Sequence, residues 1–492
     1  MPAIDRLPLR RTQCHSLGPI DENESTTKGN QNILKNIFHD QYGLPAEWKP
    51  GGLWDKGLRL IYGDQKTWAR LWNIKRNAAI EQDLPGYGQM RWMLPIPALF
   101  HLKMNFLKII HQTHWEANPP PKIKKPATSY SDSEDSDAPT TSASGATRGF
   151  HESPSFLKNA RDFWQRKDIG QNAKHNFFAL EEFMIHNFQA RIMAGLWMRL
   201  EQHTGKKILD DEGLDEVASK LDPAILDILI NKISEDYLYK DPGGEQDAEL
   251  QNHMRFLQMV EPYLMLKYGV KWGDVGLIQW AIDRMCIYFH GSNSKNYALL
   301  TLFWQHHTIA KDVASRELSR AILSNSLVNT TGRPDGWKEI DIFGEHHNGE
   351  MKDIFHDRRT STFDFRNLFE YASLNSRFCK ELKRDIRTFF GVRVNNTHTN
   401  KSAAMDVRTY AERLQESSMR PQVRSGIKSV SDLWQDGLAK LYQQIKKYNA
   451  TLPTNRAETE EVLDAETALI DLAEELEGFY ELDANNEYED VD

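Results

Sequence analysis

The chain has 492 residues, of which 40% are hydrophobic, and its 13 Trp and 22 Phe are enough apolar material for two or three folded domains. Its three cysteines, Cys14, Cys286 and Cys379, are far apart and lack a second cysteine or paired histidine at zinc-ligand spacing, which argues against a disulfide framework and a zinc ribbon. No stretch approaches the ~18 apolar residues of a membrane span, and the polar start lacks a secretory signal, so we expect a nuclear or cytoplasmic protein without a membrane partner.

The net charge of −9 is unevenly distributed along the chain. Residues 457–492 contain fifteen Asp or Glu and no Lys or Arg, so the rest of the chain carries +6. A mildly basic body with an acidic tail is compatible with two partners, DNA or a protein that binds the tail. Nothing in the sequence indicates the oligomeric state.

The first part of the chain is predicted to be a polar segment followed by an α/β region. Residues 1–45 are polar with one short helix, and residues 46–117 contain two strand–helix units side by side. In the first unit, the apolar run LRLIYG ends at Gly63-Asp64 and changes at once to helical spacing. The second unit begins with an extended run, Met90 to Leu94, and two prolines delay its helix until after position 99.

The middle of the chain is predicted to be a linker followed by helices. Residues 118–152 combine Pro, Ser, Thr and Asp with little to bury, which is typical of a disordered linker. From residue 153 to 329 the apolar residues recur at helical spacing, which predicts a helical insertion domain of roughly five to eight helices. The expected fold class is therefore mostly α with a small α/β part.

The last third is predicted to begin with a helix that carries polar residues on one face. In the segment 330–392, Glu345, Asn348 and Lys352 lie three, four and seven positions apart, so they share a face. The remaining segments are a polar loop at 393–428, a helix at 429–450 and the acidic tail at 451–492. In that tail, apolar residues among the carboxylates predict one amphipathic helix.

Several candidate residues have more than one interpretation. An Asp at a strand tip is held rigidly near solvent, as catalytic carboxylates are, but Asp64 can equally cap the helix that begins near Thr67. His111 and His114, three positions apart, could meet a metal, although histidines on such a helix are more often packed or hydrogen-bonded. The adjacent histidines after Glu345 point to different helix faces, which argues against zinc.

Five segments in order resemble a large fungal family of uncharacterised proteins, known as a domain of unknown function. The strongest matches are GDQKTWARL at 63–71, PIPALFHLKMNFL at 95–107 and LVNTTGRPDGWKEIDIFGEHHNGEMKD at 327–353. The weaker ones are GPIDENEST at 18–26 and KWGDVGLIQWAIDRMCIYFHGSNSKNYALL at 271–300. The resemblance covers about residues 12–380, and the family name implies no activity.

The order of elements is distantly similar to transposases with a ribonuclease-H-like core, particularly Mutator-type ones, in which an Asp ends a central strand and a Glu follows a helical insertion. Such enzymes hold two metal ions ~3.5 to 4 Å apart, which stabilise the attacking and leaving oxygens. This resemblance implies a partial ribonuclease-H-like core with catalytic, metal-binding Asp64 and Glu345 and with Mg²⁺ or Mn²⁺ as cofactor. The residues that would line or brace this site are His101, Asn105, Asn348 and Lys352.

One part of such a core has no counterpart here. A ribonuclease-H-like core begins with a β-hairpin whose first strand carries a further essential Asp, and the upstream Asp5, Asp21 and Asp40 are not in convincing strands. The chain is then either an N-terminally shortened relative or a differently assembled core. Because two carboxylates hold a metal poorly, we expect a transposase-derived protein with an incomplete or inactive nuclease-like core and DNA affinity. The alternative is a non-enzymatic helical interaction protein that uses its acidic tail or helical surface.

Overall fold

The structure is a computed structural model. It describes residues 4–15, 17–18, 20, 22–45, 52, 54, 57–80, 87–115, 156–170, 177–205, 220–310, 314–346, 348, 382, 385–386, 388–391, 403–417, 419 and 429–451. The predicted linker at 118–152, and the tail from residue 452 onward, lie outside the described residues.

A small parallel sheet positions the region that carries most of the candidate residues. Strand β1 (Arg59–Gly63) pairs with β2 (Met93–Pro97) in parallel, with Arg59 opposite Met93 and Gly63 opposite Pro97. Helix α2 (Gln65–Ile80) connects the two strands, and α3 (Leu99–Trp115) follows β2 directly. This is the pair of strand–helix units that the sequence predicts, and it forms a β–α–β unit.

The second strand begins and ends later than expected. The sequence predicts an extended run from Met90 to Leu94, whereas the strand includes both prolines and ends at Pro97. Proline cannot donate a hydrogen bond, so it is tolerated where its nitrogen faces away from a partner strand. Among the described residues β2 pairs only with β1, so the backbone groups on the other side of β2 need no hydrogen bond to a neighbouring strand.

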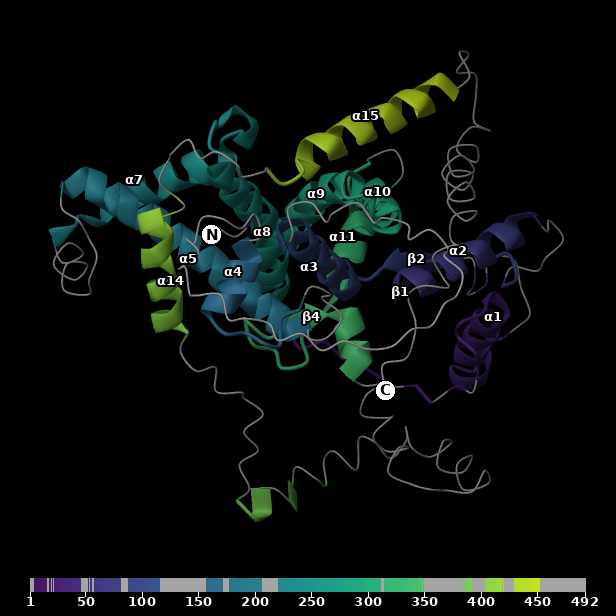
Figure 1. Cartoon of the computed structure of the whole chain (residues 1–492). Coiled ribbons are helices and arrows are strands. Elements are labelled where there is room, and N and C mark those ends of the chain that lie inside the picture. Colours follow the sequence, from purple (N-terminus) through teal and green to yellow (C-terminus); the bar gives the residue numbers. More distant parts are fainter. Residues whose placement is uncertain are drawn as a thin grey trace, which may run out of the picture.

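Helices make up most of the described chain, which confirms the mostly α class with a small sheet part (Figure 1). Four long helices are α5 (Phe177–Thr204), α8 (Ala248–Trp272), α9 (Val275–Gly291) and α15 (Leu433–Thr451). The other helices are α1 (Thr27–Lys35), α4 (Phe156–Phe163), α7 (Pro223–Ile233), α10 (Lys295–Thr308), α11 (Arg316–Asn325) and α14 (Ala404–Ser417). A second, antiparallel pair is formed by β3 (Leu327–Val328) and β4 (Lys338–Glu339).

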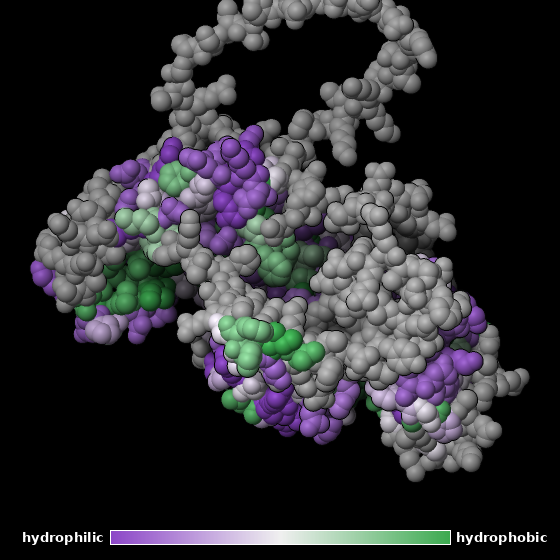
Figure 2. Space-filling view, turned by 90° about the horizontal axis from the view of Figure 1, so that it is seen from below, coloured by the Kyte–Doolittle hydropathy of each residue, from purple (hydrophilic) through white to green (hydrophobic). Residues whose placement is uncertain are grey.

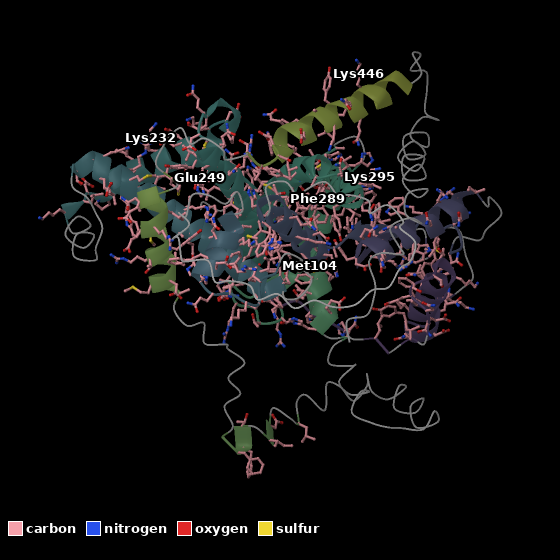
Figure 3. The ribbon with its side chains drawn as sticks, in the orientation of Figure 1. Met104, Lys232, Glu249, Phe289, Lys295 and Lys446 are labelled. Atoms are coloured by element: carbon pink, nitrogen blue, oxygen red, sulfur yellow. The ribbon has the colours of Figure 1, made fainter. Side chains whose placement is uncertain are left out.

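One hydrophobic core joins the small sheet to the helices. Phe106 on α3, Phe256 on α8 and Phe289 on α9 are all fully buried and belong to the same cluster. Figure 3 shows Phe289 at the centre of the molecule, where its ring lies 5.5 Å from that of Phe106 and 5.4 Å from that of Tyr297. The α/β units and the helices of the predicted insertion therefore share their apolar interior.

Helix α14 lies within the segment that the sequence analysis assigns to a polar loop. Its Val407, Tyr410 and Leu414 are buried, and they recur at the spacing of one helix face. The polar residues around them dominate the composition, which hides this short apolar stripe. The amphipathic pattern, rather than the composition, determines the structure here.

The turn between α8 and α9 is held in part by residues from the N-terminal end of the described chain. Gly273 ends α8 with φ of 65°, and Asp274 caps α9 by accepting a hydrogen bond from the Leu277 amide at 3.1 Å. Asp274 also accepts hydrogen bonds of 2.9 Å from the amides of Ile4 and Asp5. Residues 4–12, here called the N-terminal arm, thereby lie against this turn.

The surface of the molecule mixes polar and apolar areas. Figure 2 shows hydrophilic and hydrophobic residues interspersed over the coloured part of the visible face, with one hydrophobic area at its left end. Leu226, Ile228 and Ile230 on α7 are exposed. In the part of the chain that the structure describes, no helix combines the length and the apolar character needed to cross a membrane.

Candidate functional site

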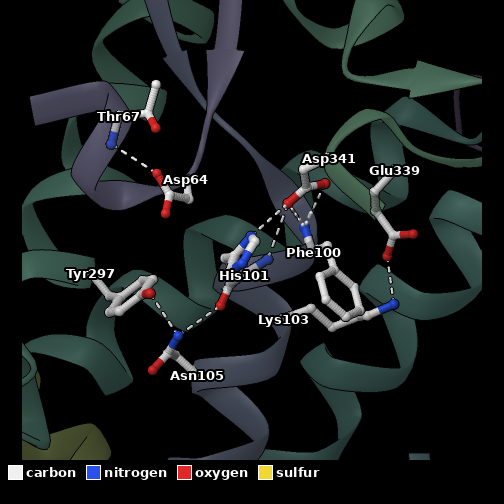
Figure 4. A network of polar contacts seen from close by, with 9 residues as sticks. All are labelled: Asp64, Thr67, Phe100, His101, Lys103, Asn105, Tyr297, Glu339 and Asp341. Atoms are coloured by element: carbon white, nitrogen blue, oxygen red, sulfur yellow. Dashed lines mark hydrogen bonds and ion pairs between the residues drawn. The ribbon is translucent and has the colours of Figure 1, made fainter. Parts of the chain in front are cut away.

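Three of the candidate residues, Asp64, His101 and Asn105, lie near the carboxyl ends of the two parallel strands, which meet at one edge of the sheet (Figure 4). Asp64 follows the last residue of β1, and His101 lies in the first turn of α3, immediately after β2. The amide of Ala98 donates to the carbonyl of Gly63 at 2.9 Å, which holds the two strand ends together. In sheets of this kind, ligands bind at the carboxyl ends of the strands.

Asp64 caps helix α2. Its Oδ1 accepts a hydrogen bond of 2.8 Å from the amide of Thr67, which lies in the first turn of the helix and has no carbonyl acceptor within it. Its other carboxylate oxygen points away from Thr67, on the side where His101 and Asn105 lie (Figure 4). The capping role expected as one alternative is therefore present, and it engages one of the two carboxylate oxygens.

Asp341, which the sequence analysis does not select, holds the start of α3. Its carboxylate accepts hydrogen bonds from the Phe100 amide at 3.0 Å and from the His101 amide at 3.2 Å. It also lies 3.2 Å from Nδ1 of the His101 ring. A helix N-terminus attracts anions, and here a carboxylate 240 positions away in the sequence takes that place.

His101 lies among three carboxylates. The hydrogen bond with Asp341 raises the pKa of His101, the charges of Asp341, Asp64 and Glu345 act in the same direction, and partial burial acts against them. Asp64 and Glu345, the two predicted catalytic residues, thus both influence one imidazole. The protonated ring is the form that this surrounding stabilises.

Two neighbouring contacts brace this region. Nδ2 of Asn105 donates to the His101 carbonyl at 2.9 Å and to the Tyr297 hydroxyl at 2.6 Å, which joins α3 to α10. Nζ of Lys103 forms a buried ion pair with Glu339 at 2.5 Å. Because Glu339 precedes Asp341 by two residues, this pair anchors the segment that carries Asp341.

The predicted residues on the last helical segment are only partly described. Residues 340–346 are helical, so Glu345 lies one turn after Asp341 on the same face, and Glu345 is exposed. Asn348 is exposed as well, and Lys352 lies outside the described residues. The spacing of four between Asp341 and Glu345 is the sequence signal that could have revealed Asp341.

A sequence profile described as a family of unknown function, DUF6589, matches residues 1–133 and 141–398. The chain belongs to this family. No curated protein and no solved structure matches the chain. The expectation of a family of unknown function is confirmed, whereas the fungal origin and the transposase similarity stay predictions.

The described residues of this DUF6589 chain do not fit a resident metal ion. Among them there is no group of three or more His, Cys, Asp or Glu side chains that could hold one. Asp341 already accepts hydrogen bonds through both oxygens, and Asp64 uses one oxygen to cap α2. Mg²⁺ and Mn²⁺ prefer several oxygen ligands at once, so this arrangement supplies too few.

The histidine pair on α3 of the DUF6589 chain is packed in the core. His111 and His114 are fully buried, and burial lowers their pKa values to about 4 and about 3. The ring of His111 lies 4.7 Å from that of Trp115. Both imidazoles are therefore neutral near pH 7, as in the packed interpretation.

Proposed function

We propose that this chain is a transposase-derived protein that binds DNA through a nuclease-like core whose catalytic site is incomplete. One observation carries the proposal. Asp64 directly follows β1 at the carboxyl end of two parallel strands, and Glu345, 281 positions later in the sequence, lies one helical turn after the Asp341 carboxylate that contacts the ring of His101. A carboxylate at a strand end and a second one after a long helical segment are the arrangement that the resemblance implies.

The hydrogen bonds of Asp64 and Asp341 support the part of the proposal that the chain does not cleave DNA. Two-metal phosphodiester chemistry needs carboxylate oxygens that are free to bind ions. In this chain one oxygen of Asp64 caps α2, and Asp341 is occupied by two backbone amides and an imidazole. Under this proposal a carboxylate–histidine pair occupies the place where an active relative would bind cations.

The carboxylate–histidine pair has a positioning role in this proposal. With Nδ1 of His101 facing Asp341, Nε2 is the ring atom that points away from that carboxylate. A carboxylate that holds one ring nitrogen fixes the orientation of the other. The pair thus favours the cationic form of the imidazole near Asp64, and that form reduces the negative charge that would otherwise repel a phosphate backbone.

The test is a binding and cleavage assay on the full chain. A fluorescein-labelled DNA duplex should bind with an affinity that falls by about tenfold or more between 50 and 200 mM salt, because phosphate contacts release counterions. Neither Mg²⁺ nor Mn²⁺ should produce cleavage. Matched variants are Asp64→Asn and Glu345→Gln, since asparagine caps a helix as well as aspartate does.

Two outcomes would contradict this function. Cleavage by the wild type that disappears in Asp64→Asn would show that the site is a working nuclease. A lack of DNA binding even at 50 mM salt would remove DNA as the partner.

A second candidate function is that of a helical interaction protein without enzymatic activity. It is favoured by apolar residues exposed on α7, namely Leu226, Ile228 and Ile230. Removal of residues 457–492 distinguishes the two candidate functions by its effect on DNA binding. It should strengthen DNA binding under the first proposal, because fifteen negative charges that compete with phosphate are lost, and should have no DNA-related effect under the second.

A further inference from the structure

Helix α15 packs on α9 through one face only. A Cβ at Gly437 would lie 2.0 Å from the carbonyl oxygen of Ile287, so the two helices approach to backbone contact there. Nζ of Lys440 donates to the carbonyl of Gly291 at 3.0 Å and to Oδ1 of Asn293 at 2.6 Å, at the end of α9. Figure 1 shows α15 above α9 and α10, with its C-terminal half extending past them.

A flank of α15 beside this packed face carries an exposed apolar stripe. Leu438, Tyr442 and Ile445 are 38%, 70% and 50% exposed. They are four and three positions apart, so they line one side of the helix, here called the α15 stripe. Lys446, which projects from the same half of the helix in Figure 3, adds an exposed positive charge beside it. A surface helix normally presents polar residues on such a face.

We propose that the acidic segment of the same chain, residues 459–477, covers the α15 stripe as the second helix of an antiparallel hairpin. The sequence of this segment is typical of an amphipathic helix. Thr459 can cap it, Glu460 and Glu461 occupy its first turn, and Gly478 follows its end. Its apolar residues are Val462, Leu463, Leu469, Ile470, Leu472 and Leu476.

The charges of the two segments are complementary. Helix α15 contains three lysines and one aspartate, which gives it a net charge of +2. Residues 459–477 contain eight carboxylates and no Lys or Arg. In an antiparallel arrangement the carboxylates at the start of the acidic segment come nearest to Lys446, near the C-terminal end of α15. The opposite charges of the two segments attract each other, and salt weakens this attraction.

The connection has a suitable length for a hairpin. Helix α15 ends at Thr451, Pro453 follows two residues later, and seven residues separate α15 from Thr459. Helix–helix connections of about 2 to 8 residues are usual, and a proline just after a helix is common. The acidic segment can therefore fold back on α15 without a long closed loop.

The apolar residues of the two segments fall at matching heights. Both helices rise about 1.5 Å per residue, so residues equally far from the connection lie level with each other. Tyr442 is nine residues before Thr451 and Leu469 is nine residues after Glu460. By the same rule, Leu438 lies between the levels of Leu472 and Leu476. The α15 stripe thus meets an apolar stripe along its length.

The test is amide hydrogen exchange on the full chain, read by mass spectrometry. In the wild type, amides of 459–477 should exchange at least about tenfold more slowly than an unstructured chain, and Tyr442→Ser/Ile445→Ser should remove this protection. The matched control is Ile228→Ser on α7, which replaces an exposed apolar residue far from the stripe and should leave the protection unchanged. The double variant Leu469→Ser/Leu476→Ser changes the acidic segment and leaves the sequence of α15 unchanged. It should also remove the protection of amides 459–477.

Measurement at several protein concentrations distinguishes docking of the acidic segment within one chain from contact with a second copy. Protection that is constant from 1 to 50 μM supports docking within one chain, whereas protection that rises with concentration would assign the stripe to a second copy and overturn the proposal. Unprotected amides in the wild type, or equal protection in the wild type and both double variants, would overturn it as well.

Discussion

Asp341 and His101 are joined by two contacts of 3.2 Å, one to the backbone amide of His101 and one to its ring nitrogen Nδ1. The same carboxylate therefore caps α3 and fixes the orientation of an imidazole in its first turn. Removal of this carboxylate should affect the helix start and the charge of the ring together.

The pH dependence of stability should report on His101. The pKa of His101 is raised in the folded chain, chiefly by Asp341, so its contribution to stability is complete below the unfolded value near 6.5 and is lost as the pH rises through the folded value. Asp341→Asn should reduce the free energy of unfolding by about 1 to 2 kcal/mol at pH 5.5 and by less at pH 8.5. Urea denaturation at both pH values measures this, and an equal loss at both would contradict the role of the ring charge.

Gly273 should tolerate alanine poorly for two reasons. Its φ of 65° is unfavourable for other residues, and a Cβ there would lie 2.7 Å from Nε1 of Trp337. We expect Gly273→Ala to lower the free energy of unfolding by more than about 2 kcal/mol. Gly205→Ala is the matched control, because Gly205 has φ of 68° but open space around it, and should cost only about 1 kcal/mol. Similar losses at both positions would show that Trp337 is not a constraint.

Substitution of Asp274, which caps α9, should lower stability more than substitution of most other helix caps. It is fully buried and accepts hydrogen bonds from the amides of Ile4, Asp5 and Leu277. Asp274→Ala should reduce stability by about 3 kcal/mol, since it leaves buried amides without acceptors. Asp222→Ala, at the exposed cap of α7, should cost about 1 kcal/mol. Limited proteolysis should show in parallel that the N-terminal arm is cleaved faster in Asp274→Ala only.

For the ion pair between Lys103 and Glu339, the loss of one charge should destabilise the fold more than the loss of both. Their side chains are 10% and 6% exposed, so removal of one partner leaves the other charge in an apolar surrounding. Lys103→Met or Glu339→Leu alone should cost about 3 kcal/mol, whereas the double substitution should cost clearly less. A double-mutant cycle by chemical denaturation measures the coupling. Additive losses would mean that each charge is already well solvated.

The elements that depend on local pattern could be predicted from the sequence. The strand before Gly63-Asp64, the helix after it and the helix at 429–450, observed as Leu433–Thr451, follow from apolar spacing and caps. The helix of α14 was missed because its short apolar stripe lies in a polar segment. Composition described that segment correctly, but it did not determine the conformation.

The parts of the site that depend on distant contacts could not be predicted. The strand end before Asp64 is a local signal that singles this residue out, whereas His101 enters only through the resemblance to transposases. Asp341 reaches α3 from 240 positions away, and no local pattern encodes that contact. The N-terminal arm is similar, because its partners Asp274 and Asn329 are about as remote in the sequence.

The position of the N-terminal arm has a consequence for synthesis of the chain. Thr12 exchanges two hydrogen bonds with Asn329, of 2.8 and 2.9 Å, and Asp274 holds Ile4 and Asp5. The ribosome makes the arm first and these partners roughly 270 to 320 residues later, which at about 5 to 20 residues per second is a delay on the order of tens of seconds. Throughout that interval Leu7 and its neighbours lack their native partners, so a nascent-chain chaperone would have its longest opportunity to bind there.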